Sequence, residues 1–117
     1  MKSNSQILMD FNNAKRQAAR LEDAARSIRR ESGRMSDCRN DVSAAWSGDN
    51  ASKFIAKMGI VSEDLEKIAS SLEKTAEVIR KNAKTMYDAE MEAKRIAEER
   101  THFSGGGGGG GGGGRGF

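Results

Sequence analysis

The 117-residue sequence contains no proline, a single cysteine and few aromatic residues: one Trp, one Tyr and four Phe. Without proline, nothing in the backbone forbids long uninterrupted helices. A lone cysteine excludes a disulfide within the chain. No segment approaches the roughly 20 apolar residues of a membrane-spanning helix, and the run Ile7-Leu8-Met9 is too short for a Sec signal peptide. These absences predict a small helical protein that is made in the cytoplasm.

Charge is plentiful but nearly balanced. Charged residues make up 32% of the chain, apolar residues 36%, and the formal net charge is +3. So small an excess, diluted by carboxylates, argues against a nucleic-acid partner. A chain this short and polar buries only a modest core by itself.

Groups that could support catalysis are also missing. His102 has no second His or Cys at metal-binding spacing. The glycine run is not followed by the Lys-Ser of a phosphate-binding loop. Acidic residues precede basic ones by four positions, as in Glu63 with Lys67 and Glu77 with Lys81, which is typical of a solvated helix face. We therefore expect no enzymatic activity, no catalytic or metal-binding residue and no cofactor.

Two series of apolar residues recur in alternating steps of four and three, the 3.5-residue repeat of a helix packed along one seam. They predict an all-α antiparallel hairpin, with helices over about 4–43 and about 50–100 and a turn over about 44–49. The first series is Ile7, Phe11, Ala14, Ala18, Leu21, Ala25, Ile28, Met35 and Val42, interrupted by Ser32. The second is Ala51, Phe54, Met58, Val61, Leu65, Ile68, Leu72, Ile79, Met86, Ala89, Ala93 and Ile96, with Thr75 and Asn82 as polar members.

The apolar stripes are wider than one hairpin can cover. A row of mostly small residues widens the second stripe: Ile55, Ala69, Ala76, Ala83 and Ala97. A long apolar flank on a polar protein marks an interface, and two hairpins packed face to face bury it in a four-helix bundle. We expect a dimer whose hairpin and dimer core contains Phe11, Leu21, Ile28, Met58, Val61, Leu65, Ile68, Leu72, Ile79 and Met86.

Local signals set the expected helix ends. Ser3 and Gln6 have the spacing of a capping box. Asp49 or Asn50 is expected to cap the second helix, and Gly48 supplies the backbone freedom that the reversal needs. The helical domain is expected over residues 1–104, followed by a disordered polyglycine tail over residues 105–117.

The only tryptophan of the chain stands at the predicted reversal, in the segment Ala44-Ala45-Trp46-Ser47-Gly48-Asp49-Asn50-Ala51-Ser52-Lys53-Phe54. Here the sequence resembles the WXG family, the early-secreted-antigen-like substrates of bacterial type VII secretion. Trp46 and Gly48 match the turn and secretion motif, and Ala51 and Phe54 match positions associated with it. The resemblance extends over roughly residues 3–100.

The resemblance implies a helical hairpin that forms homo- or heterodimers and is exported without a Sec signal by the type VII machinery. Some relatives escort larger toxins that carry a similar helical domain. Trp46 is expected both to cover the loop end of the core and to be read by another protein. The charge balance and the lack of a long apolar segment predict no nucleic-acid partner and no direct membrane insertion.

One family feature is altered. Relatives often carry a Tyr-X-X-X-Asp/Glu export signal after the second helix, but here Met91 stands four places after Tyr87. Either Tyr87 and Glu90 form a shifted signal, or the chain has none and is carried out by a partner. Two other functions remain open: a cytoplasmic chaperone-like adaptor for a larger toxin, and a structural coiled coil unrelated to secretion.

Overall fold

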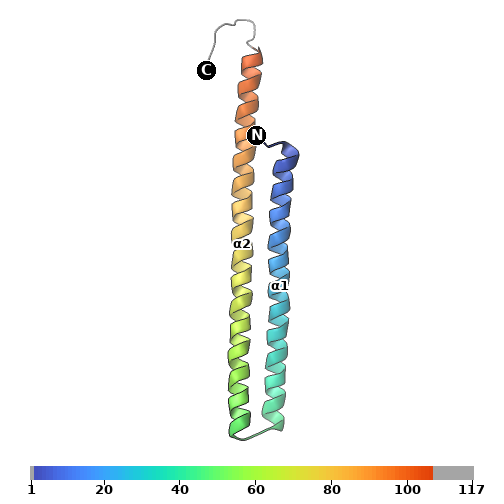
Figure 1. Ribbon diagram of the computed structural model, residues 1–117, viewed down its shortest axis with the longest axis vertical. Coiled ribbons are helices and arrows are strands. Elements are labelled where there is room, and N and C mark those ends of the chain that lie inside the picture. The colour runs from blue at the N-terminus through green and yellow to red at the C-terminus, as the bar shows by residue number, and fades with distance from the viewer. Residues whose placement is uncertain (1, 107–117) are drawn as a thin grey trace.

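The computed structural model describes residues 2–106, with side chains through Thr101. Two helices account for almost all of this part: α1, Asn4–Ala45, and α2, Asp49–Gly106. They run antiparallel as a rod of 93 × 20 × 12 Å (Figure 1). No strand occurs in the described residues. The all-helical hairpin predicted from the sequence is confirmed.

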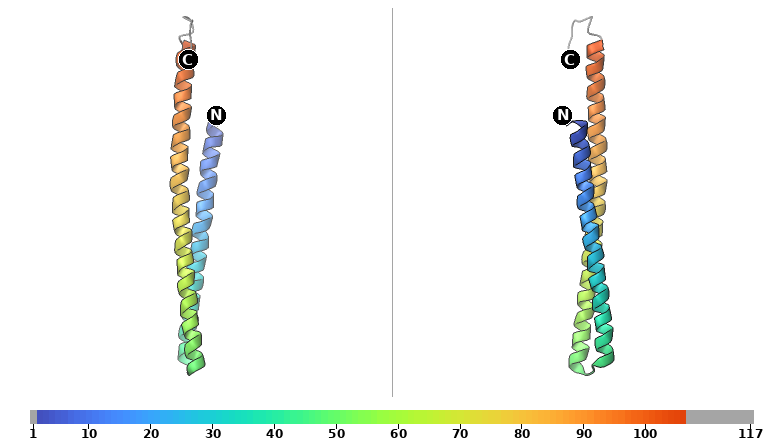
Figure 2. Two further views of the ribbon diagram at one scale, coloured as in Figure 1. Left: turned by 60° about the vertical axis from the view of Figure 1, so that its left-hand side comes forward. Right: turned by 90° about the vertical axis from the view of Figure 1, so that its right-hand side faces the viewer.

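The helices differ in length, so the rod has one closed and one open end. α1 has 42 residues and α2 has 58. At the closed end a short turn joins them, and at the open end α2 continues past the start of α1 (Figures 1 and 2). α2 also includes Gly105 and Gly106, which the sequence placed in the tail. The expectation for the rest of the tail falls on residues 107–117, outside the described part.

At the start of α1, one of the two hydrogen bonds of the predicted capping box forms. The Ser3 hydroxyl accepts a hydrogen bond from the Gln6 backbone N–H at 3.1 Å, which satisfies one free donor of the first turn. The Gln6 side chain does not reach back to Ser3. It donates instead to the Asp10 carboxylate at 2.8 Å.

The start of α2 differs in detail from the expectation. Asp49 is already helical, and Gly48 precedes it with φ +105°. The Gly48 carbonyl accepts the first backbone hydrogen bond, from Ser52, at 3.0 Å. Asp49 therefore lies in the first turn, where its negative charge suits the positive helix end, and not at the cap itself.

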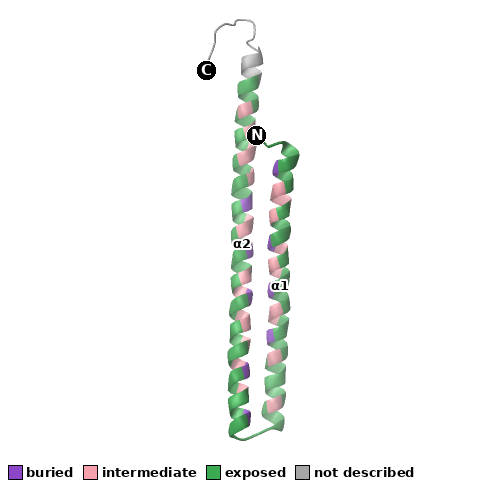
Figure 3. Cartoon of the chain, viewed as in Figure 1, coloured by how far each residue is buried: buried purple, intermediate pink, exposed green. Residues whose placement is uncertain are grey.

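The seam between the helices is built mainly from small side chains. Figure 3 shows buried residues confined to the facing sides of the two rods. Small residues at the contact bring two helix axes close together, so long side chains on either side of the seam stay partly exposed. The buried apolar residues are Ile7, Ala18 and Ala25 on α1, and Ala51, Met58, Ala69, Ala76 and Ala83 on α2.

One buried layer is polar. Ser32 is 4% exposed, and its Oγ lies 2.8 Å from the Oγ of Ser62 on the other helix. Each hydroxyl also lies within hydrogen-bond distance of the other residue's carbonyl, at 3.3 and 3.4 Å. The pair satisfies its polar atoms inside the seam, so the layer does not carry the cost of buried unpaired groups.

Candidate functional site

The turn places Trp46 at the closed end of the rod. Its backbone is extended, and its N–H donates to the Val42 carbonyl at 2.8 Å, which closes α1. The indole is 50% exposed and packs against Phe54, with ring centroids 6.2 Å apart. Within the motif, Trp46 and Phe54 thus form a half-exposed aromatic pair at the tip of the hairpin. Ala51, one helical turn before Phe54, is buried beneath the turn.

A glycine suits position 48 because of its backbone conformation, and not because a side chain would lack room there. Its φ of +105° is one that residues with a side chain rarely adopt. A Cβ built at this position meets nothing within 4 Å. The spacing between Trp46 and Gly48 therefore reflects how the chain leaves α1 and enters α2.

A broad apolar surface, which we name the open face, runs along one edge of the seam. Its outermost row on α2 is largely uncovered: Phe54, Val61, Ile68 and Ile96 are 42–48% exposed. Met86, in the next row toward the seam, is 59% exposed near the open end. Half-buried apolar residues from both helices fill the space between the outermost row and the seam. They are Ala14, Leu21, Ile28, Met35 and Val42 on α1, and Leu65, Leu72 and Ile79 on α2.

The predicted core residues therefore divide into two groups. Met58 is buried, and Phe11, Leu21, Ile28, Leu65, Leu72 and Ile79 are half-buried. Val61, Ile68 and Met86 are exposed in the single chain. The small residues beside them take the centre of the seam, and the place of these three side chains in a dimer core stays a prediction.

The opposite edge of the seam is charged. Arg29 of α1 forms ion pairs with Glu66 and Glu73 of α2, the second at 2.6 Å. Farther along, Arg80 of α2 pairs with Glu22 of α1 at 2.5 Å. Hydrogen bonds from these arginines hold the pKa of Glu73 and of Glu22 below the usual range of a carboxyl group. This edge, unlike the open face, already has partners within the chain.

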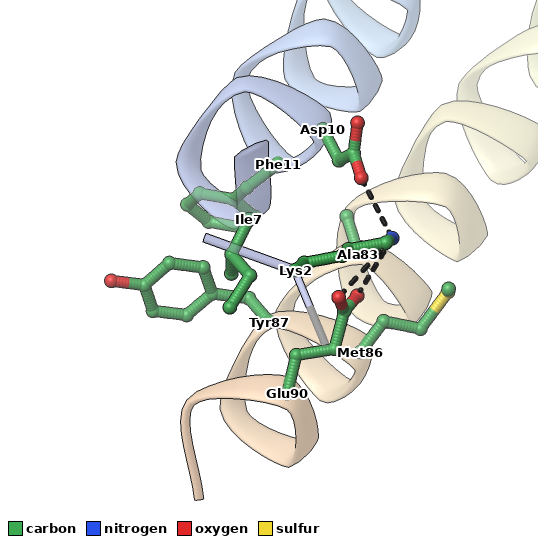
Figure 4. Close-up of a pocket in the computed structure, with 8 residues that line it drawn as sticks. All are labelled: Lys2, Ile7, Asp10, Phe11, Ala83, Met86, Tyr87 and Glu90. Atoms are coloured by element: carbon green, nitrogen blue, oxygen red, sulfur yellow. Dashed lines mark hydrogen bonds and ion pairs between the residues drawn. The ribbon is translucent and has the colours of Figure 1, made fainter. Parts of the chain in front are cut away.

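At the open end, Tyr87 contacts α1, and Glu90 contacts Lys2, which precedes α1. The Tyr87 ring lies on Phe11, with centroids 4.8 Å apart. Glu90 forms an ion pair with Lys2 at 3.1 Å, and Lys2 forms a second ion pair with Asp10 at 2.7 Å. Figure 4 shows the Lys2 ammonium between the two carboxylates, with the Tyr87 hydroxyl pointing away from them.

These residues line a pocket of about 190 Å³, together with apolar side chains that include Ile7 and Met86. The ion pairs raise the pKa of Lys2, chiefly through Asp10. Sequence reasoning singled out Tyr87 and Glu90 but missed Lys2 and the aromatic contact, because periodicity does not say which residues meet across a hairpin.

Neither catalytic chemistry nor a metal site was expected from the sequence. Across the side chains that the structure describes, no group of three or more potential ligands could hold a metal ion. Cys38 is exposed, and the side chain of His102 lies outside the described part. Over residues 2–106, no helix is both long and apolar enough to cross a bilayer.

The comparison with protein families decides the identity of the hairpin. A family model described as WXG100, proteins of 100 residues with WXG, matches residues 6–91. The chain belongs to the WXG100 family. This is a family of small, non-enzymatic helical proteins associated with type VII secretion, whose members pair as helical hairpins. Comparison with curated proteins and with solved structures gave no match.

The range matched by the family model includes the turn between the two helices. It begins just inside α1, spans the reversal at Trp46 and Gly48, and ends at Met91. The part of α2 beyond Met91 and the polyglycine run lie outside it. The hairpin and its turn are thus the family portion of the chain.

Proposed function

We propose that this WXG100 protein pairs with a helical hairpin through its open face and leaves the cell with that partner through a bacterial type VII secretion system. The observation that carries the proposal is that the two helices cover each other along one side only, which leaves the open face uncovered. Ion pairs occupy one edge of its seam, whereas the other edge leaves long apolar side chains such as Val61, Ile68 and Met86 exposed. A soluble rod with such a face is completed by a second hairpin.

We further infer that the export signal is supplied by another protein. Tyr87 packs on Phe11 and Glu90 pairs with Lys2, so both side chains of the shifted signal are half-buried and already make contacts within the chain. The position four residues after Tyr87 carries Met91 and no acid. These contacts support an escorted chain over one that is exported by its own signal.

The same observation favours a second candidate, a chaperone-like adaptor. Such a protein would hold the helical domain of a larger toxin in the cytoplasm and stay behind when the toxin is exported. It would use the same open face and would need no signal of its own.

The test is expression in a type VII-competent host, first of the chain alone and then with the gene that neighbours it. We expect the chain in the culture medium only with its neighbour, and not in a strain that lacks the secretion ATPase. Export of the neighbour while this chain stays inside would establish the adaptor. If strains with and without the secretion ATPase release equal amounts of the chain into the medium, both functions are rejected.

A further inference from the structure

The open face is bounded on α2 by one row of residues, each seven positions from the next. We call this row the α2 strip. Its four large apolar residues are exposed, and so are its central Thr75 and Asn82. The α2 strip consists of Phe54, Val61, Ile68, Thr75, Asn82, Ala89 and Ile96.

The position of the strip on the helix shows what it faces. The residues Ile68, Thr75 and Asn82 each directly precede one of the buried alanines that contact α1. Successive residues of an α-helix are about 100° apart around its axis. The strip is therefore turned through roughly a right angle from α1, which is where the second neighbour of a helix lies in a four-helix bundle.

The corresponding row of α1 is different in character. The residues that precede Phe11, Ala18 and Ser32 are polar, and the one that precedes Ala25 is a small alanine: Asp10, Gln17, Glu31 and Ala24. A second hairpin therefore gains apolar contact mainly along α2. The helix that best covers the α2 strip has an apolar row with a polar interruption at the same level as Thr75 and Asn82, because an apolar neighbour would leave the Asn82 amide without a hydrogen-bond partner.

The α2 strip of a second copy satisfies this condition in one antiparallel register. When two strips meet about a point between Val78 and Ile79, Thr75 of each copy faces Asn82 of the other. Apolar residues then face apolar residues, Ile68 opposite Ala89 and Val61 opposite Ile96. A shift by one repeat in either direction places Asn82 against Ile68, or Thr75 against Ala89, and mismatches polar with apolar groups.

This register also uses the unequal helix lengths. α2 runs from Asp49 to Gly106, so its midpoint lies close to Val78. Antiparallel pairing about that point overlaps the two α2 helices over their full length. The segment of α2 that projects past α1, which exposes Ile96, then lies beside the turn end of the other copy. Val78 itself, 54% exposed on the flank of the strip, comes next to the two-fold axis.

We propose that two copies of this chain pair through their α2 strips, antiparallel about Val78–Ile79, with reciprocal Thr75–Asn82 contacts that fix the register. The inference deepens the proposed function by naming the occupant of the open face, but it does not depend on secretion. A signal-bearing escort then either binds this dimer or replaces one copy.

The test uses purified chain in a Cys38→Ser background, in which Thr75→Cys and Asn82→Cys are made separately. A thiol crosslinker shorter than about 10 Å, two helical turns, is applied to each variant and to their mixture. We expect a crosslinked dimer in the mixture and none in either variant alone. Crosslinking of Thr75→Cys or Asn82→Cys alone would establish a shifted register and overturn the proposal, as would no crosslink in the mixture.

A charge exchange provides a second measurement that needs no crosslinker. Thr75→Lys is expected to weaken the dimer by about tenfold or more. Adding Asn82→Glu to the same chain is expected to restore it, because the introduced ammonium of each copy would then face the introduced carboxylate of the other. Both positions are exposed, so helicity is expected to stay at the level of the unmodified chain. No rescue, or a chain that sediments as a 12.6 kDa monomer, would overturn the proposal whatever the secretion assay shows.

Discussion

Ser32 and Ser62 face each other across the seam with their Oγ atoms 2.8 Å apart, and Ser32 is almost fully buried. The hydroxyls also contact each other's backbone carbonyls, so the two residues form one unit. In a seam otherwise made of alanine and aliphatic side chains, this is the layer at which sliding of one helix along the other leaves hydroxyls unpaired.

We expect Ser32→Ala and Ser62→Ala each to lower the free energy of unfolding by about 1 kcal/mol, since each removes a hydrogen-bond partner. The double variant is expected to lose clearly less than the sum, because the second substitution removes a group that has already lost its partner. Urea unfolding at one fixed protein concentration measures all three. Strict additivity would show that the serines do not act as a unit.

The charged edge of the seam makes stability depend on pH. The pKa of Glu22 and of Glu73 is lowered in the folded chain by Arg80 and Arg29. A carboxylate with a depressed folded pKa stabilises the fold above its unfolded pKa, about 4.3 for glutamate, and that stability is lost as the pH falls through the folded pKa. We therefore expect the melting temperature to decline from about pH 5 downward.

The matched control is the Glu22→Gln, Glu73→Gln double variant, followed by circular dichroism over the same pH range. It is expected to melt lower at pH 7 and to show a shallower decline with acid. Because these ion pairs are largely exposed, the difference in melting temperature between the unmodified chain and the variant is expected to shrink in high salt. An equally steep decline in the variant would place the pH dependence elsewhere.

Gly48 and Gly33 offer a matched pair of substitutions. A Cβ meets nothing within 4 Å at either position, but only Gly48 has a positive φ. Gly48→Ala is expected to cost about 1–2 kcal/mol through backbone strain, whereas Gly33→Ala is expected to stabilise α1 by up to about 1 kcal/mol. Denaturant unfolding distinguishes the two signs, and equal effects would show that conformation is not what Gly48 provides.

Trp46→Ala separates packing from recognition. The indole is half exposed and contacts Phe54, so its loss is expected to cost less than the about 3–5 kcal/mol of a fully buried tryptophan. We expect an export defect larger than this loss explains. If Trp46→Ala melts nearly as before and is exported normally, the indole only covers the end of the hairpin.

The sequence predicted the two helices because the 3.5-residue repeat is regular along both of them. It placed Val61, Ile68 and Met86 in the apolar stripe of α2, but it could not say which part of that stripe faces α1. Periodicity shows the width of a stripe and not the order of its neighbours. Ala69, Ala76 and Ala83 take the inner position because their size allows the closer approach of α1.

The candidate site was predictable where it is local in sequence. The turn at Trp46 and Gly48 could be located because both residues belong to one short segment. The contacts of Phe11 with Tyr87 and of Lys2 with Glu90 join residues far apart along the chain. They depend on the pairing register of the hairpin, which side-chain packing decides and no single motif encodes.

The thinness of the rod has a consequence for passage through a secretion apparatus. The hairpin is 93 Å long but only 20 × 12 Å across, and pairing side by side adds thickness without adding a bulge. Two such hairpins together remain about two helix diameters wide in each direction, or roughly 20–24 Å. A conduit of that bore could transmit the folded pair lengthwise, so translocation would require alignment of the long axis with the channel and no unravelling of either helix.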